Sequence, residues 1–161
     1  MANVIKLRKG LDINLKGRAI KKKVECQASK TVALRPSDFT GIVPKVVVRE
    51  GDHVLAGDAL FVNKQFPEVK FASPVSGTVK SILRGERRRV LSVSVEADDK
   101  LDYRDFGQHD ASKMDGNAVK QLLLEAGLFG YINQLPYAIS TDPCTTPKGI
   151  FVSALRDMPL A

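Results

Sequence analysis

The chain has 161 residues, with 25 Lys and Arg against 18 Asp and Glu, two Cys, no Trp and a formal net charge of +7. This length suits one domain or two small ones, and 43% hydrophobic residues are enough for a real core. The composition excludes a disordered tail, a collagen-like repeat and a disulfide miniprotein, and no segment resembles a membrane span or a signal peptide. We therefore expect a soluble, cytoplasmic protein.

The positive charge is concentrated at the start of the sequence. Residues 1–30 hold nine basic residues and only two acidic ones, whereas residues 31–161 hold 16 of each sign. A block of this kind, centred on Lys21, Lys22 and Lys23, is suited to docking on anionic lipid, an acidic partner or RNA. A solvated strand edge and loop would carry the same charges, so both interpretations stay open here.

The cysteines and histidines predict neither a metal site nor a redox site. Cys26 and Cys144 lie far apart and form no C-x-x-C pair, and His53 and His109 are equally isolated. No ligand spacing for zinc, haem or an iron–sulfur cluster is present. We therefore expect reduced thiols and no bound metal, and the spacing gives no support to a catalytic Cys–His pair.

Residues 1–97 have the pattern of many short strands. Leu and Ile alternate with polar residues over 11–15, which is the period of a half-buried strand. In the last strand of the series we expect Leu91, Val93 and Val95 to point to one face of the sheet, and the residues between them to the other. After the strand at 11–15, the strands of the series are expected at 31–35, 46–48, 59–62, 69–72, 78–83 and 90–95, separated by Gly and Pro turns. This spacing predicts a β-rich sandwich or barrel over residues 1–97.

The pattern changes after residue 97. Residues 98–114 are polar and predict a linker, and a helix capped by Asp115 or Ser112 is expected to follow. An apolar run at 149–155 predicts a strand, so 115–161 is expected to be the start of a second, truncated domain. The apolar helix positions, spaced i, i+3, i+4 and i+7, are Val119, Leu122, Leu123 and Ala126, and Gly127 is the expected C′ residue.

Two related half-motifs, at 48–60 and 72–79, resemble those of the biotinyl/lipoyl-type barrel-sandwich fold. In that family the modified lysine stands eight residues before the proline of the second half-motif. The residue at this place is Phe66, and Lys64 and Lys70 are out of register. We therefore predict the fold without a lipoyl or biotinyl lysine.

Further segments carry a resemblance to a single family. They lie at residues 5–12, 44–52, 72–79, 84–88, 123–128 and 150–161. In this order they resemble the N-terminal part of the A subunit of the bacterial Na⁺-translocating NADH:quinone oxidoreductase. The resemblance implies an α+β, mostly β chain: a barrel-sandwich hybrid domain, then the start of an α/β domain related to the C subunit of the Rnf complex and to the flavin subunit of complex I.

The resemblance also implies a function. Such a chain is a peripheral subunit on the cytoplasmic face of the bacterial inner membrane, in a complex that oxidises NADH with quinone and exports Na⁺. FMN, FAD, riboflavin and iron–sulfur centres belong to other subunits. The implied partners are those subunits, above all the quinone-site membrane subunit, and the membrane surface, with no nucleic acid. This part of the chain is expected to serve assembly near the quinone, without a catalytic residue or cofactor of its own.

One departure from the related proteins concerns flavin. In the Rnf and complex I relatives, a glycine-rich loop after a helix holds flavin and NADH. Here the glycine run is replaced by Tyr131, Ile132, Asn133, Gln134 and Leu135, so we predict that the flavin site is lost. Phe129, Tyr131 and Tyr137 are suited either to a quinone headgroup or apolar partner, or to packing in the second domain.

Three alternative functions remain at this point. A flavin- and NADH-binding subunit of an Rnf-type complex would take up FMN. A biotin or lipoate carrier would be labelled at Lys64 or Lys70 by a ligase. An RNA-binding module would lose affinity steeply with salt, and with neutralisation of Lys21, Lys22 and Lys23.

Overall fold

The computed structural model describes residue 16, residue 20 and residues 22–152. Contacts divide the chain into two units, 1–27 with 147–161, and 28–146. The described residues of the first unit carry no helix or strand. All helices and strands named below belong to the second unit, and the strand expected at 11–15 lies outside the described residues.

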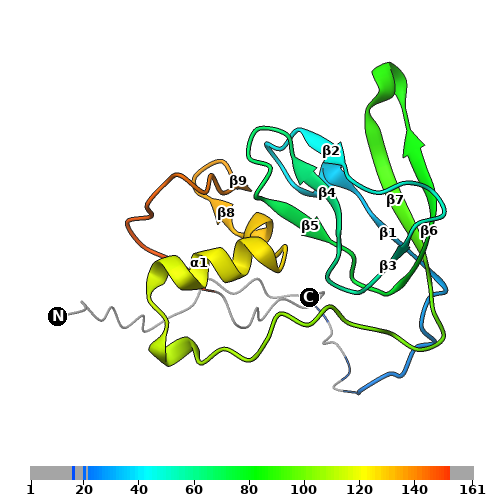
Figure 1. Cartoon of the computed structure of the whole chain (residues 1–161), viewed down its shortest axis with the longest axis horizontal. Coiled ribbons are helices and arrows are strands. Elements are labelled where there is room, and N and C mark those ends of the chain that lie inside the picture. The colour runs from blue at the N-terminus through cyan, green and yellow to red at the C-terminus, as the bar shows by residue number, and fades with distance from the viewer. Residues whose placement is uncertain (1–15, 17–19, 21, 153–161) are drawn as a thin grey trace. The chain divides into compact units, whose positions relative to one another are not determined.

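Two antiparallel sheets form the β-rich part of the second unit (Figure 1). The four-stranded sheet has the order β1-β7-β6-β3, and the three-stranded sheet has the order β2-β4-β5. The strands of the first are β1 (Thr31–Leu34), β7 (Val90–Ala97), β6 (Gly77–Arg84) and β3 (His53–Val54). Those of the second are β2 (Pro44–Val46), β4 (Ala59–Asn63) and β5 (Lys70–Ala72).

Two turns of the same design lie on either side of β3. Each has a glycine at positive φ, 90° at Gly51 and 107° at Gly57, followed by an aspartate. The Asp52 N–H donates to the Arg49 carbonyl at 3.1 Å, and its carboxylate accepts the Arg49 N–H at 2.7 Å. Asp58 makes the same two bonds with Leu55. Its N–H donates to the Leu55 carbonyl at 3.0 Å, and its carboxylate accepts the Leu55 N–H at 2.9 Å. The sequence x-x-Gly-Asp therefore reverses the chain twice because only glycine adopts this φ without strain.

One hydrophobic core lies between the two sheets. At its centre the Phe61 and Phe71 rings stack with centroids 4.9 Å apart, and the Phe39 ring lies 4.4 Å from that of Phe71. Residues of both sheets and of the segment after the β-rich part contribute: Phe39, Val54, Leu60, Phe61, Val69, Phe71, Val79, Val90, Val93, Val95, Leu124 and Phe129. The segment after residue 115 thus shares the core of the sheets.

The one α-helix of the described residues, α1 (Gly116–Glu125), begins and ends where local signals predict. The Asp115 carboxylate accepts the Ala118 N–H at 2.7 Å, which caps the N-terminus. At the C-terminus Gly127 has a φ of 70°, and the Leu128 N–H donates to the Leu123 carbonyl at 2.9 Å, as in a Schellman motif. Within the described residues no helix is long and apolar enough to cross a membrane.

After α1 the chain forms only short elements. A two-stranded sheet pairs β8 (Asn133–Gln134) with β9 (Ile139–Ser140). Single turns of 3-10 helix occur in this segment and earlier, at Pro36–Asp38, Glu86–Arg88, Ala111–Lys113 and Phe129–Tyr131. In Figure 1 the β8–β9 hairpin is seen at the left of the two sheets, and the long β6–β7 hairpin projects at the upper right.

The strand predictions are confirmed for β1, β4, β5, β6 and β7, with four corrections. The strand expected at 46–48 is β2, which begins and ends two residues earlier, and β3 was not expected. Residues 149–152 form no strand, and the rest of the run expected there lies outside the described residues. Leu91 is 41% exposed and Val90 is buried in its place, because a register shift between Leu83 and Arg84 offsets the pairing of β6 with β7.

Candidate functional site

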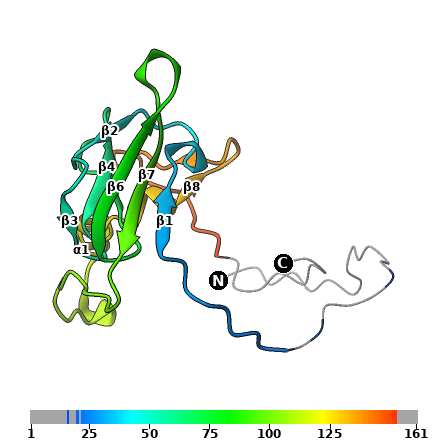
Figure 2. The same cartoon turned by 90° about the vertical axis from the view of Figure 1, so that its right-hand side faces the viewer.

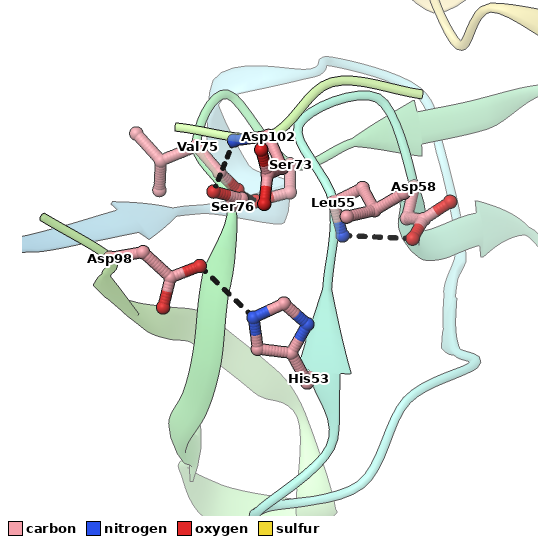
Figure 3. Close-up of polar contacts among 8 residues, drawn as sticks. All are labelled: His53, Leu55, Asp58, Ser73, Val75, Ser76, Asp98 and Asp102. Carbon is pink, nitrogen blue, oxygen red and sulfur yellow. Dashed lines mark hydrogen bonds and ion pairs between the residues drawn. The ribbon is translucent and has the colours of Figure 1, made fainter. Parts of the chain in front are cut away.

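A polar cluster joins the second half-motif to the segment that follows β7 (Figure 3). Its centre is Ser76, which is fully buried. The Asp102 N–H donates to Ser76 Oγ at 2.8 Å, and the Asp98 N–H donates to the Ser76 carbonyl at 3.0 Å. The Asp98 carboxylate also lies 3.0 Å from His53 Nε2, so the cluster reaches β3.

The same segment is bonded to the first half-motif. The Ala56 N–H donates to the Asp102 carbonyl at 3.0 Å, and the Arg104 N–H donates to the Ala56 carbonyl at 2.9 Å. The Arg104 guanidinium forms an ion pair with Asp58 at 2.9 Å, and its carbon lies 5.7 Å from the centre of the Phe106 ring. Residues 98–104 therefore bond to both half-motifs at once, and we call them the clasp.

A cavity of about 440 Å³ opens beside the clasp. It is lined by Val48, Asp52, His53, Val54, Asp58, Ala59 and Arg104. Asp58 and Arg104 form an ion pair there, His53 lies against Asp98, and the Asp52 carboxylate accepts the Arg49 N–H. No three His, Cys, Asp or Glu side chains gather at a common point among the residues with described positions. The bonds of the clasp hold the two half-motifs together through residues 98–104.

If the clasp stabilises the fold, the loss of the Ser76 hydroxyl should lower the stability of the protein. Replacing Ser76 by alanine removes the acceptor of the Asp102 N–H at a buried position. The free energy of unfolding should therefore fall by about 1–2 kcal/mol. Urea unfolding followed by circular dichroism measures this change. Ser81 lies exposed on β6, and Ser81→Ala should alter stability by no more than about 0.5 kcal/mol. Equal effects of the two substitutions would contradict the role given to the clasp.

The segment after α1, in which we expected a lost flavin loop, packs against β5. A Cβ atom built on Gly130 would lie 2.5 Å from Phe71 Cε1, and one on Gly127 would lie 2.9 Å from Ala72 Cβ. Phe129 is 7% exposed and belongs to the core. The glycines here permit close approach of backbone to a buried ring and strand.

The three aromatic residues predicted to face a quinone or partner are not gathered at one surface. Phe129 is buried in the core, whereas Tyr137 is 80% exposed. Tyr131 is half-exposed, and its ring meets Phe39 edge-on at 5.0 Å. Partial burial raises the pKa of the Tyr131 phenol above its usual value. Of the residues that replace the glycine run, Ile132 and Leu135 are also exposed.

The lysines considered at the sequence level are exposed or half-buried wherever the structure describes them. Lys64 is exposed in the β4–β5 connection, Lys70 begins β5, and Phe66 packs against the core. Lys22 and Lys23 are exposed, and Lys21 lies outside the described residues. Phe66 therefore covers part of the core at the position that would hold a modified lysine in a carrier domain.

Sequence reasoning did not single out Asp98, Asp102 or Arg104. They lie in a polar, charge-rich stretch with no motif spacing, and they bond to residues 45, 26 and 46 positions away. The one signal in the sequence is the density of charged residues immediately after the last strand of the sheet.

Comparison with known proteins agrees with the architecture. Residues 5–98 match the family model described as the NqrA N-terminal barrel-sandwich hybrid domain, and residues 114–161 match that of the NqrA second alpha/beta domain. Both the predicted fold class and the predicted family are thereby confirmed.

Curated relatives give the same result along nearly the whole chain. Proteins named as the A subunit of the Na(+)-translocating NADH-quinone reductase are 34% identical in Yersinia pseudotuberculosis, 33% in Photorhabdus laumondii and 35% in Klebsiella pneumoniae. Each alignment covers 98% of this chain but 36% of the relative, so the chain spans about a third of their length. Because the first family model alone matches more than half of it, the chain belongs to the NqrA family, that of the A subunit of the Na⁺-translocating NADH-quinone reductase.

Proposed function

We propose that the protein is a peripheral subunit of the sodium-pumping NADH:quinone reductase, at the cytoplasmic face of the bacterial inner membrane. In that complex, NADH oxidation by quinone is coupled to Na⁺ export. The names of its curated relatives support the assignment to this complex. We propose further that this part of the chain assembles with the other subunits near the quinone and has no redox centre of its own.

The observation that carries the second proposal is the packing of Gly130. A flavin phosphate or ring would need open space beside the loop backbone, bordered by free N–H groups. Instead the Phe71 ring, which has no exposure, occupies the side of Gly130 where a Cβ would point. The Tyr131 N–H and the Ile132 N–H are also already bonded, to the Leu128 and Phe129 carbonyls at 3.2 and 3.1 Å. The residues present do not fit a flavin.

A titration with FMN and NADH tests this proposal. We expect the full-length protein to give no saturable quenching of FMN fluorescence and no saturable change in NADH fluorescence. A flavodoxin at equal concentration serves as the positive control. Saturable uptake of FMN would contradict the proposal and favour the Rnf-type alternative, in which the chain binds flavin and NADH.

The contribution to quinone binding is proposed for Tyr131 and Tyr137, the two exposed members of the aromatic set. Leu128 and Leu135, at 52% and 66% exposure, give the same segment an apolar surface suited to a ring or to an apolar face of another protein in the complex. A photoreactive quinone added to membranes that contain the complex should label this segment. Labelling confined to other subunits would leave the segment without a role at the quinone.

Docking by the N-terminal basic block is proposed on charge alone. Lys22 and Lys23 are exposed, and the anionic cytoplasmic leaflet contributes about 1 kcal/mol per basic residue close to the membrane. Neutralising Lys21, Lys22 and Lys23 together should therefore weaken membrane association at low salt. Flotation of the purified protein with anionic vesicles measures the effect.

A further inference from the structure

The β6–β7 hairpin projects beyond the other strands (Figures 1 and 2). Its two strands have eight residues each, and residues 85–89 connect them. Near the connection Val90 still packs in the core, whereas Leu83 is 56% exposed and Leu91 is 41% exposed. One face of the hairpin therefore supports the core, and its connection and the two exposed leucines are accessible to a partner.

The end of this hairpin carries a concentrated positive charge. Four of the ten arginines in the chain lie within six residues, with Glu86 as the only acidic residue among them, and all four are exposed: Arg84, Arg87, Arg88 and Arg89. We call these four residues the arginine tip. Between residues that the structure describes, none of the four forms an ion pair.

The backbone holds the arginine tip in an unfavourable conformation. Arg87 and Arg88 have φ angles of 53° and 60°, although a turn with two positive φ angles favours Asn-Gly. The turn is closed by the Gly85 N–H on the Arg89 carbonyl at 2.8 Å and the Arg89 N–H on the Glu86 carbonyl at 3.1 Å. Placing arginine twice where glycine would be less strained indicates that the side chains themselves are required.

The residue type indicates what the arginine tip binds. Attraction to an anionic membrane depends on charge and does not discriminate arginine from lysine, yet the tip has no lysine. The guanidinium group differs from an ammonium group in its planar fork, which binds a carboxylate or a phosphate through two parallel hydrogen bonds. The exposed Leu83 and Leu91 add apolar contact area behind the tip, as in a protein interface with an apolar centre.

We propose that the arginine tip docks on an acidic protein surface, where Asp or Glu carboxylates accept paired hydrogen bonds from Arg87 and Arg88. The partner is a protein that presents clustered carboxylates in a recess or on a face that a narrow hairpin can reach. This proposal goes beyond the membrane and quinone roles above, and it rests only on the charge, exposure and backbone of residues 83–91.

The test uses the full-length protein and a fluorescein-labelled oligoglutamate peptide, with binding followed by fluorescence anisotropy. Arg87→Gln with Arg88→Gln should weaken binding about tenfold, because two charge-assisted contacts are lost. Arg87→Lys with Arg88→Lys keeps the charge but removes the fork, and we expect a loss of about threefold or more. Lys64→Gln with Lys100→Gln is the matched control, since it removes two exposed charges elsewhere, and it should change binding less than about twofold.

Four results would overturn the proposal. Absence of saturable binding by the unsubstituted protein, or equal losses in the glutamine and control variants, would show no specific acidic site. Full binding by the lysine variant would show attraction to charge alone. A selective loss of binding to phosphatidylglycerol vesicles in the glutamine variant, with peptide binding unchanged, would assign the arginine tip to lipid instead.

Discussion

Replacing Gly77 by alanine should destabilise the protein by about 4 kcal/mol, a loss in the range of the most severe single substitutions. Gly77 begins β6 with a φ of 154°, which L side chains rarely adopt. A Cβ atom there would lie 2.0 Å from the Glu96 carbonyl oxygen and 3.0 Å from the Ala97 Cα. Both contacts are with the backbone of the paired strand β7, so relief requires the two central strands to separate.

Two other glycines serve as controls, because they distinguish the steric clash of an added Cβ atom from the backbone strain of a positive φ. Gly51 has a φ of 90° and no atom within 4 Å of its Cβ position, so Gly51→Ala should cost only about 1–2 kcal/mol of backbone strain. Gly116 opens α1 with equal space and no positive φ, and Gly116→Ala should leave stability unchanged or raise it by up to about 1 kcal/mol. Denaturant unfolding of the three variants gives the order of their stabilities. A Gly77 variant no less stable than the Gly51 variant would contradict the contact argument.

Replacing Gly130 by alanine should cost about 2–3 kcal/mol, because overpacking a rigid core forces side chains from their rotamers. The added Cβ would meet Phe71 Cε1 at 2.5 Å and Cζ at 2.7 Å. That ring cannot move aside, since it stacks on Phe61 and contacts Phe39. Differential scanning calorimetry or urea unfolding measures the loss.

A double-mutant cycle shows whether the loss comes from this contact. Phe71→Leu alone leaves a cavity and is destabilising, but it frees the space that the Gly130→Ala methyl group needs. The double variant should therefore be more stable than the sum of the single effects predicts, by about 1 kcal/mol or more. Additive effects would show that Gly130 and Phe71 do not constrain each other, and would remove the main argument against a flavin at this loop.

Local signals in the sequence predicted most of the elements correctly. The caps of α1 depend on Asp115 and Gly127, which lie within a few residues of the groups they satisfy. The two x-x-Gly-Asp turns beside β3 are likewise closed by neighbours in sequence. Such features can be read from a short window because donor, acceptor and backbone conformation all lie inside it.

Features that depend on a distant strand could not be read in this way. The exposure of Leu91 results from a shift in the pairing of β7 with β6, and no property of residues 90–95 alone reveals it. The apolar positions expected on α1 are half-buried, and Leu124 is buried instead because the helix packs against the core of the sheets. The spacing indicated an apolar stripe, but its contact with the core is set by tertiary packing.

The candidate site was predictable in part. The family resemblance identified the segment after Gly127 as the place where flavin-binding relatives differ, and Gly127 and Gly130 lie beside Ala72 and Phe71 of β5. The packing of Gly130 on Phe71 and the bonds of the clasp join residues 22 to 59 positions apart. Such long-range contacts leave no periodic signal in one sequence, and they became visible only in the structure.

The central claim is that this protein is a non-flavin subunit of the sodium-pumping NADH:quinone reductase. The most direct measurement is affinity purification of the tagged full-length protein from detergent-solubilised membranes of its own host, with the recovered proteins identified by mass spectrometry. The claim predicts co-purification of the membrane subunits of the pump, and no flavin attached to or bound by the tagged chain after it is separated from them. Recovery of soluble proteins alone, or flavin retained by the isolated chain, would contradict it.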